Sequence, residues 1–200
     1  MGQDSLPSGN SKPSSRSRPQ KKQRGPKKPK KITPEYLHNS GLYYLERFSS
    51  SSANFRAVML RKAQKSCYAW PEQDFDACTR MVDELVQKFI RLELLNDALY
   101  TRSKIYSLRR AGKSRRFIFS SLGVKGLEKN MIEKALAAYD AEHGLESSEK
   151  DAALTFARKK KIGPFRGTKE KNPQKELSAM ARAGFSYDLA KAIVDVDEEF

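Results

Sequence analysis

Apolar residues recur with helical spacing through most of the chain, from about residue 34 to residue 196. The strongest run follows Pro71, with spacings that alternate between three and four positions, at Phe75, Cys78, Val82, Leu85, Phe89 and Leu92. Such spacing places one apolar stripe along one side of a helix. No segment alternates apolar and polar residues convincingly over the length of a strand. The pattern therefore predicts an all-α fold.

The stretch from Gly112 to Leu136 predicts two short amphipathic helices separated by a tight turn. The first helix should run from about Ser114 to Val124 and the second from about Lys129 to Ala141. Gly126 lies in the turn between them, and a weaker copy of the pattern 58 residues later places Gly184 at the equivalent position. We interpret this similarity as an internal repeat.

Capping and helix-breaking residues divide the rest of the chain into helices. They predict helix starts at Pro34, Ser52, Pro71, Asn96, Ser147 or Ser148, Pro173 and Ser186. The first helix should reach about Phe48, and Gly112 and Gly144 should end two later helices. The result is three groups of three helices, over residues 34–95, 96–145 and 146–200. Stacking of consecutive groups would bury their remaining apolar faces in an elongated, curved bundle.

The charge balance indicates a polyanionic partner, because 39 Lys and Arg residues face 24 acidic residues, for a net charge of +15. Residues 1–33 hold ten of these cations against the single Asp4, with almost no apolar residues. This composition predicts a disordered basic arm that contacts phosphates loosely. The alternatives are a solubilising tail without a defined partner and, with less support because the segment is not amphipathic, a transit peptide.

Further cations cluster at two predicted helix junctions that occupy equivalent places in the second and third groups. A repeated cluster favours contact with nucleic acid or an acidic protein. The alternative is a solvated face whose cations stabilise helix C-termini. The candidate binding residues are Arg109, Arg110, Lys113, Arg115, Arg116, Lys125, Arg158, Lys159, Lys160, Lys161 and Arg166.

No arrangement of residues indicates catalysis or metal binding. His38 and His143 are isolated, and the spacing of Cys67 and Cys78 fits no usual zinc site. No apolar run approaches the length of a transmembrane helix. We therefore expect a cytoplasmic protein that is not an enzyme and uses no cofactor, metal, membrane or small-molecule substrate.

Four segments together resemble the RecX family, proteins that regulate the bacterial recombinase RecA. They are Ser52-x-x-Phe55-Arg56, Leu94-Leu-Asn-Asp97 leading into Tyr100, Gly112-Lys-Ser-Arg-Arg116 with Ile118, Leu122 and Gly126, and Lys159-Lys-Lys-Ile-Gly-Pro-Phe-Arg166. The resemblance spans about residues 36–196 and implies three tandem three-helix repeats.

The resemblance also implies a role in recombination, DNA repair and the SOS response. Such a protein would bind in the groove of the RecA filament on single-stranded DNA and inhibit filament growth, ATP hydrolysis and strand exchange. The expected partners are RecA and single-stranded DNA, with double-stranded DNA as a further candidate, and the chain should be a monomer. The second hypothesis is a basic nucleic-acid-binding protein, including a helix-turn-helix regulator that uses Ser114–Ala141.

Overall fold

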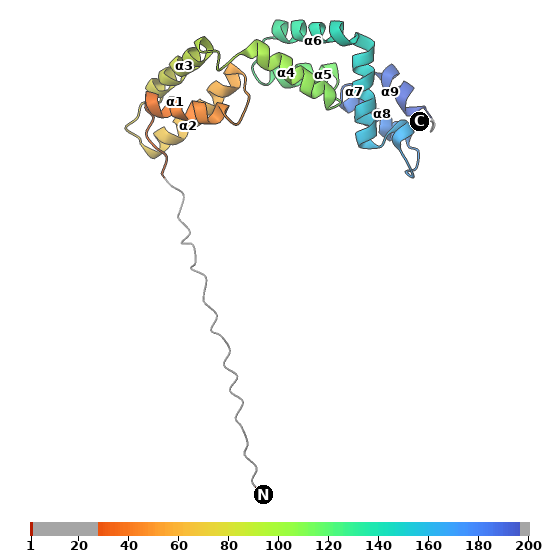
Figure 1. The fold of residues 1–200 in the computed structure, drawn as a ribbon, viewed down its shortest axis with the longest axis horizontal. Coiled ribbons are helices and arrows are strands. Elements are labelled where there is room, and N and C mark those ends of the chain that lie inside the picture. Colours follow the sequence, from red (N-terminus) through yellow and green to blue (C-terminus); the bar gives the residue numbers. More distant parts are fainter. Residues whose placement is uncertain (2–27, 197–200) are drawn as a thin grey trace.

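The computed structural model describes Met1 and residues 28–196, which form an elongated, arched body of α-helices (Figure 1). This part of the chain contains nine α-helices, one short 3-10 helix and no strand, so the predicted all-α fold is confirmed. The helices are α1 (Pro34–Leu45), α2 (Ser52–Ala69), α3 (Phe75–Arg91), α4 (Asp97–Arg110), α5 (Arg115–Gly123), α6 (Lys129–His143), α7 (Leu145–Lys160), α8 (Pro173–Arg182) and α9 (Tyr187–Val194), with η1 (Gly163–Phe165) after α7.

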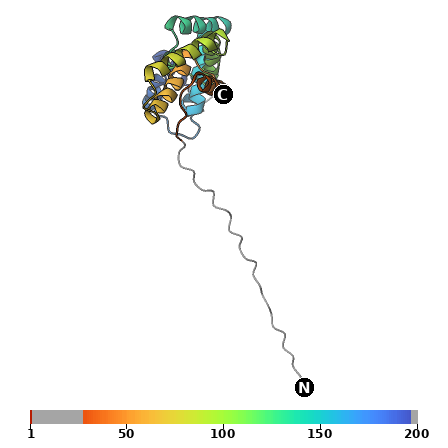
Figure 2. The ribbon, with the colours of Figure 1, turned by 90° about the vertical axis from the view of Figure 1, so that its left-hand side faces the viewer.

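Three separate hydrophobic cores follow one another along the arch. Phe55 and Phe89 are fully buried in the first core, Ile118 and Leu136 in the second, and Met180 in the third. Seen from the side in Figure 2, the body is narrow compared with its length. The first core includes Ile32, which precedes the predicted range 34–95, and the division of the chain into the ranges 34–95, 96–145 and 146–200 stays a prediction.

Three helix boundaries differ from the prediction. Helix α1 ends at Leu45 rather than near Phe48, because the chain turns there and the amide N–H of Arg47 bonds to the carbonyl of Tyr44, only three residues earlier. Helix α3 begins at Phe75 rather than Pro71, since Asp74 caps it.

Helix α7 was predicted to start at Ser147 or Ser148 and instead begins at Leu145. Gly144 has a φ of +78°, which lets α7 follow α6 with no linker between them. The Ser148 hydroxyl therefore does not cap the helix and donates to the Gly144 carbonyl at 2.6 Å.

Residues 28–33, which fall within the predicted basic arm, are packed on the first group of helices. Ile32 is 4% exposed, and its backbone N–H and carbonyl both bond to the side-chain amide of Gln73, each at 3.1 Å. The indole N–H of Trp70 donates to the carbonyl of Pro29 at 2.8 Å. The disorder predicted for residues 28–33 is therefore wrong, and the prediction for residues 2–27 lies outside the described residues.

Equivalent hydrogen bonds, each from a serine hydroxyl to a backbone carbonyl, join the first group to the second and the second group to the third. The hydroxyl of Ser51, which caps α2, donates to the carbonyl of Lys125 at 2.6 Å. The hydroxyl of Ser114, which caps α5, donates to the carbonyl of Ala183 at 2.6 Å. Each accepting carbonyl lies one residue before a glycine that the sequence pattern made equivalent, Gly126 or Gly184.

A carboxylate accompanies the serine at each of these two contacts. The first amide of α2, at Ser52, donates to Asp97 Oδ1 at 2.7 Å, and the first amide of α5, at Arg115, donates to Glu149 Oε2 at 3.1 Å. A negative charge is favourable at a helix N-terminus, where backbone N–H groups have no partner within the helix. We refer to these two sets of contacts as the first joint and the second joint.

Candidate partner-binding surface

The second joint is built around the turn at Gly112, which follows α4 with a φ of +76°. A Cβ atom at this position would lie 2.9 Å from the amide nitrogen of Phe156 and 3.0 Å from the carbonyl oxygen of Ala152, both in α7. These contacts are with backbone, which cannot move aside as a flexible side chain can. Glycine therefore lets the end of α4 pack directly on α7.

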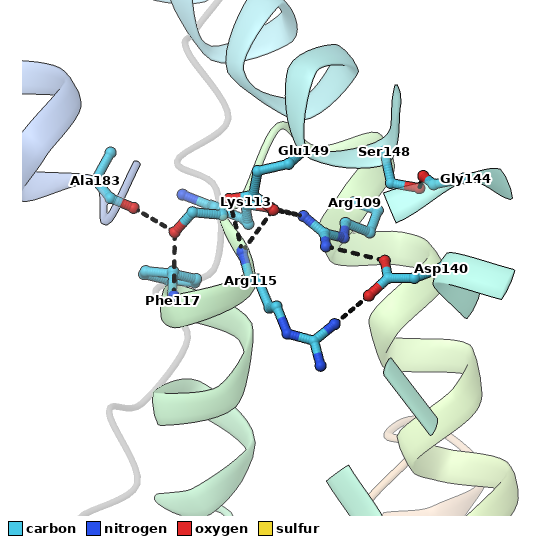
Figure 3. Close-up of polar contacts among 10 residues, drawn as sticks. Arg109, Lys113, Arg115, Phe117, Asp140, Gly144, Ser148, Glu149 and Ala183 are labelled. Atoms are coloured by element: carbon cyan, nitrogen blue, oxygen red, sulfur yellow. Dashed lines mark hydrogen bonds and ion pairs between the residues drawn. The ribbon is translucent and has the colours of Figure 1, made fainter. Parts of the chain in front are cut away.

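Two arginines and two carboxylates form a network beside this turn, in which Arg109 and Asp140 are buried and Arg115 and Glu149 are partly exposed; we call it the buried network (Figure 3). The Arg109 side chain, only 2% exposed, pairs with Asp140 of α6 at 3.3 Å and with Glu149 of α7. Arg115 pairs with the second oxygen of Asp140. The two positive charges balance the two negative charges, and the four residues connect α4, α5, α6 and α7. Removing one member would leave a buried charge without its partner, which is strongly destabilising.

Arg109 and Arg166, two of the predicted binding residues, lie inside the protein. Arg166 is 5% exposed, and its guanidinium bonds to Glu176 at 2.7 Å and to the carbonyl of Val194 at 2.6 Å. In this conformation neither guanidinium faces an external partner. Both hold helices together, so we correct their predicted place from the surface to the interior.

Most of the other predicted cations are exposed, and the structure brings the two clusters together. The Lys159 ammonium donates to the carbonyl of Ala111 at 3.0 Å, so the end of α7 lies against the end of α4. Lys113, half-buried, holds its ammonium 4.6 Å from the centre of the Phe117 ring. The exposed cations are Arg110, Arg116, Lys125, Arg158, Lys159, Lys160 and Lys161. We refer to Arg110, Lys113 and Lys159 as the junction surface.

Two cations of the prediction have a local structural role. The Lys159 ammonium bonds to the carbonyl of Ala111 at the C-terminal end of α4. This is the role expected if the cations form a solvated face that stabilises helix C-termini. Lys125 lies apart from the junction surface, at the first joint, where its ammonium donates to Asn54 Oδ1 at 3.3 Å.

Sequence reasoning missed a further basic face on α2, which carries Arg61, Lys65 and Tyr68. The signal was present, because positions four and three residues apart share one side of a helix. No group of three His, Cys, Asp or Glu side chains suited to hold a metal occurs among the described residues. Nor does any helix within residues 28–196 have the length and apolar character needed to cross a membrane.

Comparison with known proteins gives one consistent result. No family model matches the sequence. The chain is 42% identical over 171 residues to Regulatory protein RecX of Myxococcus xanthus, covering 84% of this chain and 89% of that protein. It is 30% identical over 167 residues to Regulatory protein RecX of Agrobacterium fabrum, covering 82% and 84%. The crystal structure of RecX from Lactobacillus salivarius shares the fold, with a TM-score of 0.52 at 23% identity over 80% of this chain and 94% of that one.

Proposed function

The chain belongs to the RecX family, and we propose that it regulates the RecA recombinase by binding the RecA filament on single-stranded DNA. Binding there would inhibit filament growth, ATP hydrolysis and strand exchange. The observation that carries this proposal is the match at 42% identity, over 84% of the chain, to a protein named as a regulatory protein.

The shape and charge of the protein support filament binding. An arched body with three successive cores offers an extended surface, which suits contact with a polymer. The junction surface lies where the second group meets the third, and its cations suit acidic side chains or DNA phosphates. Filament binding by a monomer needs no catalytic group, in keeping with a regulator rather than an enzyme.

The helix-turn-helix alternative has less support from the charges of α6. In that alternative α6 would enter the major groove of DNA. Its exposed Lys129 and Lys134 are balanced by the exposed Glu133 and Glu142. A recognition helix without a positive excess is poorly suited to phosphates, because binding to DNA relies on cations that displace counterions.

The test is to measure ATP hydrolysis by RecA on single-stranded DNA while the full chain is added. We expect inhibition at less than one molecule per RecA subunit. The Arg110→Ser/Lys113→Ser variant should need a higher concentration for the same inhibition. The Lys88→Ser/Arg91→Ser variant is the matched control, since it removes two exposed charges from α3.

Arg115, which the sequence also places among the binding residues, is left unchanged in this test because Asp140 holds it in the buried network. Inhibition that appears only once the protein saturates the DNA would contradict filament binding and favour the second hypothesis, a basic protein that coats DNA. Equal inhibition by the junction variant and the control would exclude the junction surface as the contact.

A further inference from the structure

The exposed face of α2 and the chain that enters the first group form a basic hollow. Arg61, Lys65 and Tyr68 lie on one side of α2, and the Tyr68 side chain is 90% exposed. Together with Lys28 and Pro29 they line a hollow of about 750 Å³. This face belongs to the first group of helices, at the opposite end of the arch from α8 and α9 (Figure 1).

Two cations of this hollow, Arg61 and Lys65, have no acidic partner among the described residues, whereas Lys28 interacts electrostatically with the carboxylate of Glu72. None of the ion pairs among the described residues includes Arg61 or Lys65. The nearby carboxylate of Glu72 is paired with Lys31 at 2.7 Å. The unpaired Arg61 and Lys65 therefore leave the hollow positively charged and open to a polyanion.

Aromatic rings accompany these charges. Beside the exposed Tyr68, the Lys28 ammonium lies 3.2 Å from the centre of the Trp70 ring, and the Trp70 indole N–H holds the carbonyl of Pro29 at 2.8 Å. Among the exposed large hydrophobic side chains of the described residues, only Met1 is more exposed than Tyr68, and Arg61 and Lys65 share its side of α2. Proteins that bind single-stranded nucleic acid combine a basic groove with aromatic rings on which bases stack.

We propose that this α2 face binds single-stranded nucleic acid, with Arg61 and Lys65 on phosphates and Tyr68 stacked on a base. A duplex suits the site less well, because its base faces are covered by stacking and Tyr68 would have to separate them. The inference does not rest on the proposed regulation of RecA, since the binding can be measured with no recombinase present.

Trp70 provides a direct reporter, because it is the only tryptophan in the chain and lies beside the hollow. An oligodeoxythymidylate is added to the full chain while tryptophan fluorescence and the anisotropy of a label on the oligonucleotide are recorded. Bound nucleic acid should change the Trp70 emission, because it competes for the Lys28 ammonium that lies over the ring.

Two variants test the two kinds of contact. Tyr68→Ala should weaken binding at least about fivefold through the loss of one stacked base, and Tyr68→Phe should restore it. Arg61→Ser/Lys65→Ser should lower the slope of log affinity against log salt by about 1.4, the value for two phosphate contacts on a single strand. Lys88→Ser/Arg91→Ser, which removes the same charge from α3, should leave the stacking and the Trp70 response intact.

Several results would overturn the inference. One is equal affinity in Tyr68→Ala and the unchanged protein, with thermal melting showing both folded. Another is binding without any change in Trp70 emission, which would assign the contact to other cations. Tighter binding of duplex, or equally tight binding of polyglutamate, would assign the face to duplex DNA or to an acidic protein instead.

Discussion

The hydroxyl of Ser114 donates a hydrogen bond of 2.6 Å to the carbonyl of Ala183, although the two residues lie 69 positions apart in the sequence. The same hydroxyl accepts the N–H of Phe117 at 3.1 Å and so caps α5. One buried side chain therefore starts a helix of the second group and fixes the turn between α8 and α9 of the third. Ser51 does the same at the first joint.

Ser114→Ala should lower the free energy of unfolding by about 2 kcal/mol, because it removes both a helix cap and a hydrogen bond between groups. Ser186→Ala is the matched control, since Ser186 caps α9 and is exposed. The control should cost about 1 kcal/mol. Urea unfolding followed by circular dichroism measures both, and equal losses would show that the bond to Ala183 adds nothing.

Gly112→Ala should destabilise the protein by about 2–4 kcal/mol, from the strain of a positive φ together with overlap against the α7 backbone. Gly167→Ala provides the comparison, because Gly167 also has a positive φ, +60°, and has nothing within 4 Å of a Cβ atom. It should cost only about 1–2 kcal/mol. Thermal unfolding of the two variants compares them, and a smaller loss for Gly112→Ala would contradict the close packing.

Arg109→Met should cost about 3–5 kcal/mol, because it leaves the carboxylates of Asp140 and Glu149 partly buried with only Arg115 to neutralise them. The neighbouring Arg110→Met should change stability by about 0.5 kcal/mol at most, since Arg110 is exposed. Denaturant unfolding at neutral pH distinguishes them. If both variants unfolded at the same denaturant concentration, the buried network would have no structural importance.

The pair between Arg56 of α2 and Asp83 of α3 should give a small pH dependence. Its hydrogen bonds of 2.5 and 3.0 Å hold the pKa of the Asp83 carboxyl below its ordinary value. A lowered pKa in the folded state stabilises the protein above the ordinary pKa of about 3.9, and the effect is lost as the pH falls through the folded pKa. Both side chains are more than two-fifths exposed, so the effect is at most about 1 kcal/mol.

Asp83→Asn should therefore lower the melting temperature at pH 7 and have little effect at pH 2. Arg56→Met and the double variant complete a cycle that isolates the pair from other effects of each substitution. If the difference in melting temperature between Asp83→Asn and the unchanged protein stayed constant from pH 7 to pH 2, the pair with Arg56 would be excluded as the cause of that difference.

Cys78 should react slowly with alkylating reagents. Burial raises the pKa of its thiol to about 11, with a smaller contribution from the Cys67 thiol, whose sulfur lies 3.8 Å away. Only the thiolate reacts, so in a Cys67→Ala variant the rate with iodoacetamide should rise about tenfold per pH unit from pH 7 to pH 10. A rate that levels off near pH 8.5, the ordinary thiol pKa, would contradict this assignment.

Local sequence signals predicted most of the helices, because a cap and the amide it binds are only a few residues apart. The side chains of Asn96 and Ser186, where helix starts were predicted, each accept the N–H three positions later. Boundaries failed where another local contact intervened, as at Asp74, which caps α3 after the turn that contains Pro71.

The pairing of cations could not be predicted from the sequence in the same way. Arg109 and Arg110 are adjacent and chemically identical, yet one is buried and the other exposed. The difference depends on Glu149, 40 residues later than Arg109, and among 24 acidic residues nothing local marks it as the partner. Composition also led to a wrong prediction of disorder at residues 28–33. One apolar residue there, Ile32, is buried, and its backbone bonds to the Gln73 side chain, 41 residues later.

The two joints contribute to the curvature of the body. At each one a serine hydroxyl, a carboxylate and a glycine lie between neighbouring groups, and at the second joint Arg109 also pairs with Glu149 of α7. A small rotation at a joint would produce a larger displacement at the two ends of the arch. Substitutions at Ser51 or Gly126 would then change the curvature of the arch. The arch would fit a helical polymer of a different pitch, although the exposed side chains that contact the polymer would be unchanged.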